Sequence, residues 1–265
     1  MAIDPGLCAE PPGGPRVALG LFLKTCRSVT TLGVRPTMCD YTEAERELLL
    51  GAGKVLFPTA RFAPVFRAIE KPTFPSFMTY RCGKSRLAQL LLAGCLDAPH
   101  PRMRVYYGTA QKARIPDDFS FPVLVMGQNA RSARHVARDM EDLRRLASRC
   151  NPILVREAVA WDERVRFLCI QGRVLGAQRS FGAPDGALPA FKPEPLGLPC
   201  LEEPMAGALA IVHSAGIDDV VIEWGRRGDS WNFLEMAAPP VRWASPEGVL
   251  DRRRCICRLI QTGVV

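Results

Sequence analysis

Apolar and polar positions in the first part of the chain predict a small unit of strands and one helix. Residues 42–50 (TEAERELLL) begin with a threonine that can cap a helix, and their apolar positions recur at helical spacing. Apolar runs at 17–23 and 54–57 predict one strand before this helix and one after it. The proline-punctuated segment 71–77 is typical of a linker, so a short α/β piece is expected over residues 1–75.

The remaining chain alternates helical patterns with short apolar strands. Helices are expected at 84–93, 139–148, 203–214 and 250–262, and strands at 104–107, 121–126, 153–159, 165–170, 173–178, 219–224 and 231–236. Gln171-Gly172 and Gly228-Asp229 are turn signals, which predict two antiparallel hairpins. The segment 183–204 is rich in proline and glycine and is expected to be a loop. Helices mixed with hairpins, and little parallel winding, indicate the α+β class.

Composition excludes several classes of protein. Hydrophobic residues make up 48% and charged residues 23% of the chain, which excludes wholesale disorder. Residues 1–15 lack the apolar core of a signal peptide and are expected to be a flexible leader. No apolar run is long enough to span a membrane, and ten cysteines without a C-x-x-C pair argue against a zinc site. A soluble, reduced, cytoplasmic protein is expected.

The basic residues are almost all arginine. The formal net charge is +8, and only six of the 35 basic residues are lysine. Arginine suits planar contacts with phosphate or carboxylate, although a genome-wide preference for arginine codons explains the bias equally well. Basic charge also permits non-specific nucleic-acid binding, but no zinc-finger or aromatic RNA-binding motif is present, so a nucleic-acid partner is not expected.

Two glutamates fall at matching places on neighbouring predicted strands. Glu223 and Glu235 lie twelve residues apart on either side of the Gly228-Asp229 turn. Antiparallel pairing would bring both carboxylates to the same end of one hairpin. Such a pair can bind Mg²⁺ that is shared with a polyphosphate, whereas two solvated charges on an exposed hairpin give the same spacing.

Arginines also collect at predicted strand ends, and a lysine precedes a helix. The arginines are Arg156, Arg164, Arg166 and Arg179. They could clamp phosphate oxygens or form a solvated basic face of a sheet. Lys84 begins a predicted helix, where it would add a charge to free backbone N–H groups, but no P-loop glycines precede it and a surface lysine looks the same.

Five segments in chain order carry a resemblance to a known family. They are the helix from Lys84, FPVLVM (121–126), ILVREAV (153–159), RFLCIQGRVLGAQR (166–179) and VVIEWG…NFLEMAAPP (220–240). In this order and spacing they resemble the RimK-like carboxylate–amine ligases of the ATP-grasp superfamily, over about residues 76–241. The resemblance implies two α+β subdomains, at 76–150 and 151–265, that enclose a nucleotide cleft.

The resemblance implies roles around the phosphates of ATP. Glu223 and Glu235 would hold Mg²⁺ on the β- and γ-phosphates, and Lys84 would reach the α- and β-phosphates. Arg179 would contact the γ-phosphate and the developing acyl phosphate. Arg166 corresponds to a position that contacts substrate or nucleotide.

It also implies roles around the nucleoside. The backbone at four consecutive positions would face adenine, namely Arg156, Glu157, Ala158 and Val159. The ribose carboxylate would be either Asp162 or Glu163.

The implied reaction is activation of a carboxylate by ATP to an acyl phosphate, which an amine then attacks. The implied partners are small-molecule or peptide carboxylates and amines. The alternative is a catalytically degenerate ATP-grasp domain that binds a nucleotide or a peptide. A homodimer is an open option, because homodimers are common among soluble enzymes.

The chain departs from the family pattern at three places, which motivates that alternative. The second phosphate-binding lysine of the family is Met126 here, and the asparagine among its metal ligands is Ala237. The glycine-rich loop of the family is replaced by GQNARSARHV (127–136), which has one glycine. Arg131 or Arg134 in this loop would substitute for the missing cation.

Overall fold

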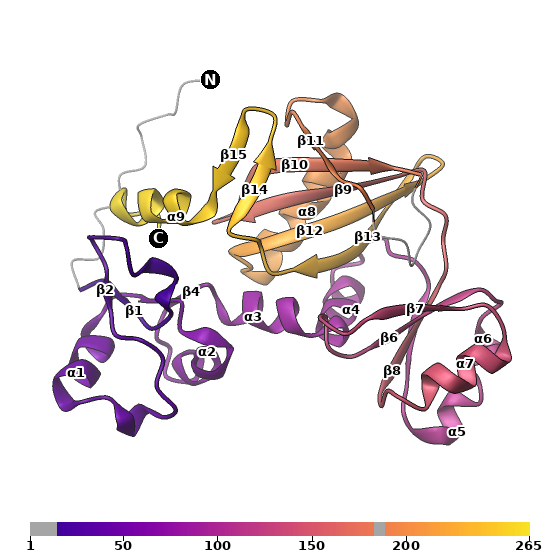
Figure 1. Cartoon of the computed structure of the whole chain (residues 1–265), viewed down its shortest axis with the longest axis horizontal. Coiled ribbons are helices and arrows are strands. Elements are labelled where there is room, and N and C mark those ends of the chain that lie inside the picture. The colour runs from indigo at the N-terminus through magenta and orange to yellow at the C-terminus, as the bar shows by residue number, and fades with distance from the viewer. Residues whose placement is uncertain (1–14, 183–188) are drawn as a thin grey trace. The chain divides into compact units, whose positions relative to one another are not determined.

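The structure, a computed structural model, describes residues 15–182 and 189–265 (Figure 1). Apart from Pro15, the expected leader lies outside the described residues, and so does the first part of the expected loop over 183–204. The chain divides into two compact units. Within the described residues, the first comprises residues 15–80, 240–243 and 249–265, and the second comprises residues 81–182, 189–239 and 244–248.

A small parallel sheet lies at the centre of the first unit. Its strands follow the order β2-β1-β3-β4, and every neighbouring pair is parallel. The strands are β1 (Val17–Ala18), β2 (Thr30–Thr31), β3 (Val55–Leu56) and β4 (Thr73–Phe74). The helices are α1 (Glu43–Gly51), α2 (Thr59–Ala68) and α9 (Arg252–Gln261), with short 3-10 turns η1 (Leu21–Leu23) and η2 (Met38–Asp40). Leu49, Val55 and Phe62 belong to one buried core of this unit, to which the C-terminal residues 249–265 also belong.

Helix α1 begins where its sequence predicts. The Thr42 hydroxyl accepts a hydrogen bond from the Glu45 N–H at 3.3 Å, and the Glu45 carboxylate accepts one from the Thr42 N–H at 2.8 Å. This reciprocal capping satisfies two backbone donors that the first helical turn leaves free. Helix α2 was not predicted, because Pro64 lies inside it and masks the helical pattern.

The first sheet of the second unit is antiparallel, with strand order β5-β8-β6-β7. Its strands are β5 (Met103–Tyr106), β6 (Val123–Gly127), β7 (Arg134–Ala137) and β8 (Ile153–Glu157), and its helices are α5 (Gly108–Lys112), α6 (Ile115–Asp118) and α7 (Met140–Ala147). Val125 and Val155 pack with Leu143 of α7 on one face. Leu124 and Met126 lie in a separate cluster, on the other face.

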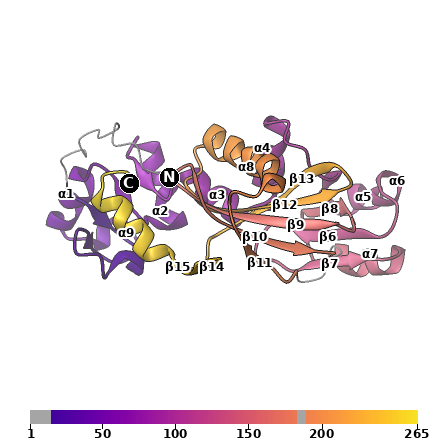
Figure 2. The ribbon, with the colours of Figure 1, turned by 90° about the horizontal axis from the view of Figure 1, so that it is seen from above.

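The second sheet is also antiparallel, with strand order β11-β10-β9-β12-β13. Its strands are β9 (Glu163–Ile170), β10 (Arg173–Phe181), β11 (Lys192–Glu194), β12 (Asp219–Arg227) and β13 (Ser230–Ala237). Helix α8 (Glu202–Ala215), which follows η3 (Pro199–Leu201), covers one face of this sheet (Figure 2). Strands β14 (Arg242–Ser245) and β15 (Gly248–Asp251) form a separate two-stranded sheet.

Both predicted hairpins are present, and the α+β class is confirmed. Gln171 and Gly172 have φ values of +50° and +68°, as the tight turn between β9 and β10 requires. The expected loop over 183–204 is wrong in its described part, because β11 and η3 lie there. Within the ranges that the structure describes, no helix combines the length and the apolar character needed to cross a membrane.

Helix α4 (Arg86–Cys95) fastens the edge of the second sheet. The Gln89 side chain donates to the Met236 carbonyl at 2.8 Å, and its carbonyl accepts from the Met236 N–H at 3.0 Å. One buried amide thus satisfies both backbone groups of an edge-strand residue. Ser85 caps α4, and Lys84 is the last residue of the preceding helix α3 (Phe77–Lys84). The expectation that Lys84 begins a helix is therefore wrong.

Two helical glycines should respond in opposite ways to alanine. A Cβ on Gly207 of α8 would lie 2.7 Å from the Trp224 ring, whereas a Cβ on Gly94 of α4 would meet no atom within 4 Å. Gly207→Ala should destabilise the protein by about 1–3 kcal/mol, since the ring or the helix must move. Gly94→Ala should be neutral or stabilise it by up to about 1 kcal/mol.

Urea unfolding of both variants measures these changes. Equal stability of the two variants would contradict the close packing of α8 on Trp224.

Candidate functional site

Four polar side chains form a row across the second sheet. Arg166 on β9 is in register with Gln178 on β10 and with Glu223 on β12. Glu223 is in register with Glu235 on β13. Residues in register on neighbouring strands project from the same face, so the two glutamates lie side by side.

Each glutamate of the row has an arginine partner. Arg164 donates from Nε to Oε1 of Glu223 at 2.7 Å, and Arg134 donates from Nη2 to Oε1 of Glu235 at 2.6 Å. Arg164 and Glu223 are almost completely buried. Burial raises the pKa of Glu223, Arg164 opposes that rise, and the nearby charge of Glu235 adds to it.

Arg166 lies between an amide and an aromatic ring. Its Nε donates to Oε1 of Gln178 at 2.8 Å, and its guanidinium lies 4.1 Å from the centre of the Phe191 ring. The Gln178 amide in turn donates to the Ala244 carbonyl at 2.8 Å. Burial lowers the pKa of Arg166, opposed by the charge of Glu223. These contacts fix the guanidinium in one orientation.

A buried arginine on α4 holds the segment between β6 and β7. Arg86 is 5% exposed and donates to the carbonyls of Gly127, Asn129, Ala130 and Ser132, at distances of 2.9–3.3 Å. It also donates to the Ser132 hydroxyl at 2.9 Å. Backbone hydrogen bonds from Arg86 to Gln128 and from Ala130 to Lys84 complete the attachment. This segment is thus fastened to the start of α4.

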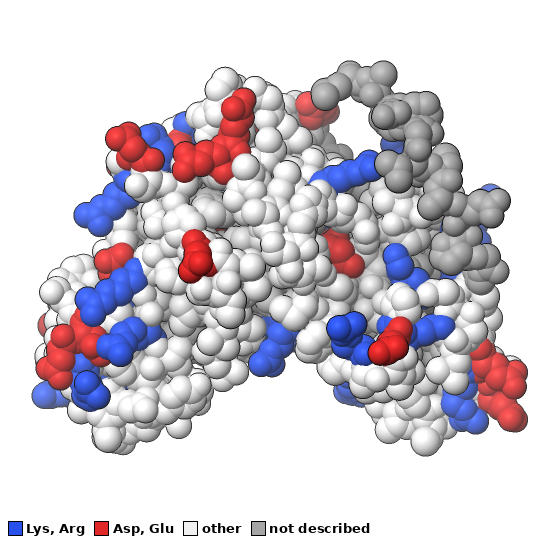
Figure 3. All heavy atoms as spheres, turned by 180° about the vertical axis from the view of Figure 1, so that it is seen from behind, with Lys and Arg blue, Asp and Glu red and all other residues white. Residues whose placement is uncertain are grey.

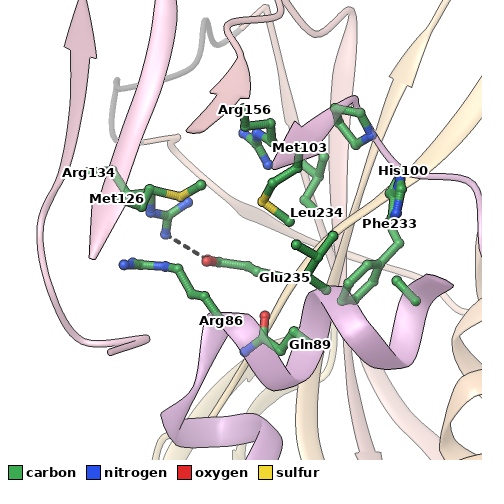
Figure 4. A pocket seen from close by; sticks show the side chains of 13 residues that line it. Arg86, Gln89, His100, Met103, Met126, Arg134, Arg156, Phe233, Leu234 and Glu235 are labelled. Atoms are coloured by element: carbon green, nitrogen blue, oxygen red, sulfur yellow. Dashed lines mark hydrogen bonds and ion pairs between the residues drawn. The ribbon is translucent and has the colours of Figure 1, made fainter. Parts of the chain in front are cut away.

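Two cavities meet at these residues. The larger has a volume of about 500 Å³ and contains five arginines and two glutamates, namely Arg86, Arg131, Arg134, Arg164, Arg166, Glu223 and Glu235. The smaller, about 20 Å³, is lined largely by apolar side chains, among them Met103, Met126, Phe233 and Leu234. Both cavities include Arg86, Arg134 and Glu235, and Figure 4 shows these three side chains beside the apolar ones. A narrow apolar slot therefore adjoins a cationic cavity.

Arg179 lies on the opposite face of the sheet from the polar row. It follows Gln178 on β10, and consecutive strand residues project to opposite faces. Its Nε donates to Glu163 at 2.7 Å, and Nε of Arg226 donates to the same carboxylate at 2.6 Å. Glu163 is buried between these two arginines. The structure thus separates Arg179 and Glu163 from Glu223 and Glu235.

Three of the residues that were predicted to contact the nucleoside already make hydrogen bonds within the protein. The N–H of Glu157 donates to the Arg102 carbonyl at 3.1 Å, and that of Ala158 donates to Pro122 at 3.3 Å. Asp162 accepts from the Gly228 N–H at 2.7 Å.

Three further positions complete the placement of the predicted site. The Arg156 side chain lines the apolar slot, and Val159 packs with Trp161 and Leu234. Lys84 is exposed and lines neither cavity.

The carboxylate pair offers oxygen ligands to a divalent cation. Both ion pairs use Oε1, so Oε2 of Glu223 and of Glu235 remains for another ligand. Mg²⁺ is commonly bound through one or two carboxylates, with phosphate and water oxygens completing its shell. In the described ranges, no third His, Cys, Asp or Glu joins the pair, and Ala237 offers no side-chain donor. The donor set fits an ion that is shared with a phosphate ligand.

Sequence reasoning missed Arg86 and Gln178. Arg86 stands at the start of an apolar helical pattern, and no motif in the sequence marks it as a functional residue. Gln178 could not have been found by counting from the Gln171-Gly172 turn, because a β-bulge between Val174 and Gly176 shifts the register by one residue and pairs Arg166 with Gln178 in place of Ala177. The same bulge places Arg179 on the other face, whereas unshifted counting would have placed it on the face of Arg166.

No protein-family model and no curated protein matches this chain. Solved structures do match it. A D-alanine–D-alanine ligase from Bacillus anthracis has a TM-score of 0.67 at 8% identity, covering 95% of this chain and 96% of that one. A RimK-domain ATP-grasp protein from Sphaerobacter thermophilus has a TM-score of 0.61 at 18% identity, covering 94% and 96%.

A third match is partial. The ADP complex of an N5-carboxyaminoimidazole ribonucleotide synthetase has a TM-score of 0.63 at 13% identity, and 84% of this chain is covered. This chain spans about 63% of the length of that enzyme. At such identities the likeness shows the fold, and substrates do not follow from a fold.

Replacing Arg86 should release the segment between β6 and β7. Arg86→Met removes five hydrogen bonds and leaves buried carbonyls without a donor, so we expect a loss of about 3 kcal/mol of stability. Amide hydrogen exchange of residues 128–133 should accelerate at least tenfold.

Arg131→Met is the matched control, because Arg131 is exposed on the same segment and should leave exchange and stability unchanged. Slow exchange in Arg86→Met would show that other contacts hold the segment.

Proposed function

From the ATP-grasp fold of this chain, we propose that the two adjoining cavities bind ATP with Mg²⁺ and that the protein is an ATP-dependent carboxylate–amine ligase. The base would occupy the apolar slot, and the phosphates would occupy the arginine-lined cavity. The RimK-domain and D-alanine–D-alanine ligase structures support this choice of reaction class.

The observation that carries the proposal is the pairing of Glu223 with Glu235 inside a cavity lined by five arginines. Five cations exceed two carboxylates by three charges, so the cavity favours an anion. A polyphosphate satisfies the arginines, and a divalent cation on the carboxylates adds to the attraction.

The apolar slot must widen to take a base. Its volume of about 20 Å³ holds roughly one water molecule. Met103 and Met126 line it, and methionine side chains are unbranched and adapt readily to a new neighbour. Movement of these two side chains would open the slot while Phe233 and Leu234 remain as its apolar wall.

In the proposed reaction, a substrate carboxylate oxygen attacks the γ-phosphorus of ATP and ADP leaves. The product is an acyl phosphate. An amine then attacks its carbonyl carbon, the amine loses a proton, and phosphate leaves with formation of an amide. Mg²⁺, held through Glu223 and Glu235, would neutralise charge on the phosphate oxygens.

Arginines of the larger cavity would stabilise the charge that develops during both steps. Arg164 and Arg166 are already oriented by Glu223 and by Gln178, so they would need little reorganisation. Arg179 and Glu163, on the opposite face, would hold the strands β9, β10 and β12 together.

A second candidate function is binding without catalysis. Both carboxylates are engaged by arginine, position 126 is apolar and position 237 is a methyl group. A degenerate domain with these features would bind a nucleotide or a peptide as a recognition module.

Nucleic-acid binding has less support. On the face drawn in Figure 3, acidic residues lie among the basic ones and no single-sign patch stands out.

Nucleotide binding should depend on Glu235. In isothermal titration with ATP, wild-type protein should bind more tightly with Mg²⁺ than without it. Glu235→Gln removes one ligand charge and should weaken Mg²⁺-dependent affinity at least tenfold.

Glu203→Gln, an exposed position on α8, is the control and should bind as wild type does. Unchanged ATP affinity in Glu235→Gln would remove Glu235 from the metal site.

Turnover separates the ligase from the binding module. With ATP, Mg²⁺ and panels of carboxylates and amines, the ligase sustains ADP release over many turnovers only when both an acceptable carboxylate and an acceptable amine are present. ATP binding with no ADP release across such panels would favour the degenerate domain.

A further inference from the structure

Position 126 presents a problem for phosphate binding. Met126 on β6 is 5% exposed and carries no charge into the apolar slot that it lines. An anion near this sheet therefore needs a cation from another position.

Arg134 lies directly opposite Met126. The antiparallel pairing of β6 with β7 puts these two residues in register, so their side chains leave the same face of the sheet. Side chains opposite each other start about 5 Å apart at Cβ, a separation that a long side chain easily spans. Both residues line the apolar slot, and Arg134 also lines the larger cavity. A guanidinium on β7 can thus reach the space that a cation at position 126 would reach.

The other arginines of the larger cavity have less capacity for a new ligand. Arg86 is buried and occupied by loop carbonyls. Arg164 is buried against Glu223, and Arg166 is held by Gln178 and the Phe191 ring. Arg131 is exposed and lies outside the apolar slot.

Arg134 combines access with free donors. Its side chain is 33% exposed, and within residues 15–182 and 189–265 its side chain makes one hydrogen bond, from Nη2 to Glu235. A guanidinium carries five N–H donors in a planar fork, so Nε and Nη1 remain for phosphate oxygens while Nη2 stays on Glu235. The same side chain would therefore touch a phosphate and the carboxylate proposed to hold the metal.

We infer that Arg134 is the phosphate-binding cation of this sheet, supplied from β7 because β6 has Met126 at the opposing position. This inference rests on the proposed binding of ATP. It assigns Arg134 as a binding residue and chooses it over Arg131, the other arginine that the sequence offered for this role.

The test compares affinities for ATP and for adenosine, both measured by isothermal titration in excess Mg²⁺. Arg134→Met should weaken ATP binding about tenfold to a hundredfold, since a charge-assisted contact is lost. Adenosine affinity should stay within twofold, because adenosine has no phosphate. A merely structural role for Arg134 would lower both affinities together, and that result would overturn the inference.

A second test exchanges the positions of the positive charge and the apolar side chain. Met126→Lys combined with Arg134→Met moves the cation to the opposing strand and should restore ATP affinity to within about fivefold of wild type. Arg144→Met, at an exposed arginine of α7 that lines neither cavity, is the matched control for loss of one positive charge and should change ATP affinity less than threefold. A double variant that binds ATP no more tightly than Arg134→Met does, although its thermal unfolding is unchanged, is the opposite result. It would contradict the inference that side chains at positions 126 and 134 reach the same phosphate.

The outcomes also separate this inference from the proposed function. Wild-type protein that binds no ATP overturns both. Wild-type protein that binds ATP, with Arg134→Met binding equally well, overturns the role of Arg134 alone.

Discussion

Two carboxylates held side by side and largely withdrawn from water repel each other, and the candidate site is arranged around that constraint. The register of β12 with β13 opposes Glu223 to Glu235, and Glu223 is almost fully buried. Such a pair is stable only when cations face it, because burial disfavours the charged form. Arg164 comes from the neighbouring strand of the same sheet, and Arg134 comes from the other sheet of the same unit. The ion pairs thus connect both sheets to one polar row.

This arrangement gives the arginines two duties. Without a ligand they compensate the carboxylates, and with a polyphosphate and a divalent cation they would meet the phosphates while the cation meets the carboxylates. Removing one partner of a buried ion pair is strongly destabilising. Binding of a ligand at this site should therefore give each charged side chain a new partner and leave none unpaired. Arg86 contributes indirectly. By fastening the segment between β6 and β7, it fixes where β7 begins and therefore where Arg134 points.

Much of the fold followed from the sequence, and less of the site did. Helix α1, the β9–β10 hairpin and the β12–β13 hairpin were predictable because each has local capping or turn chemistry. The Gly228-Asp229 turn brings Glu223 and Glu235 to the same end of that hairpin, but their direct opposition depends on a β-bulge between Glu223 and Trp224 that counting from the turn does not predict. By contrast, β7 lies in a polar segment, and its pairing with β6 is visible only in three dimensions. Arg179 was grouped with Arg166 by residue type, and the β-bulge between Val174 and Gly176 places it on the other face. Lys84 ends a helix instead of beginning one, because Ser85 is the cap of α4.

The central claim is that the paired carboxylates and the arginines around them form a site for a metal-bound polyphosphate. A crystal structure with Mg²⁺ and a non-hydrolysable ATP analogue tests it most directly. The account predicts an ion bound to Oε2 of Glu223 and of Glu235, with phosphate oxygens on Arg134 and the base in a widened slot beside Met103 and Met126. A structure that places the nucleotide elsewhere would contradict it. So would a structure in which both carboxylates remain paired with their arginines and no ion is bound.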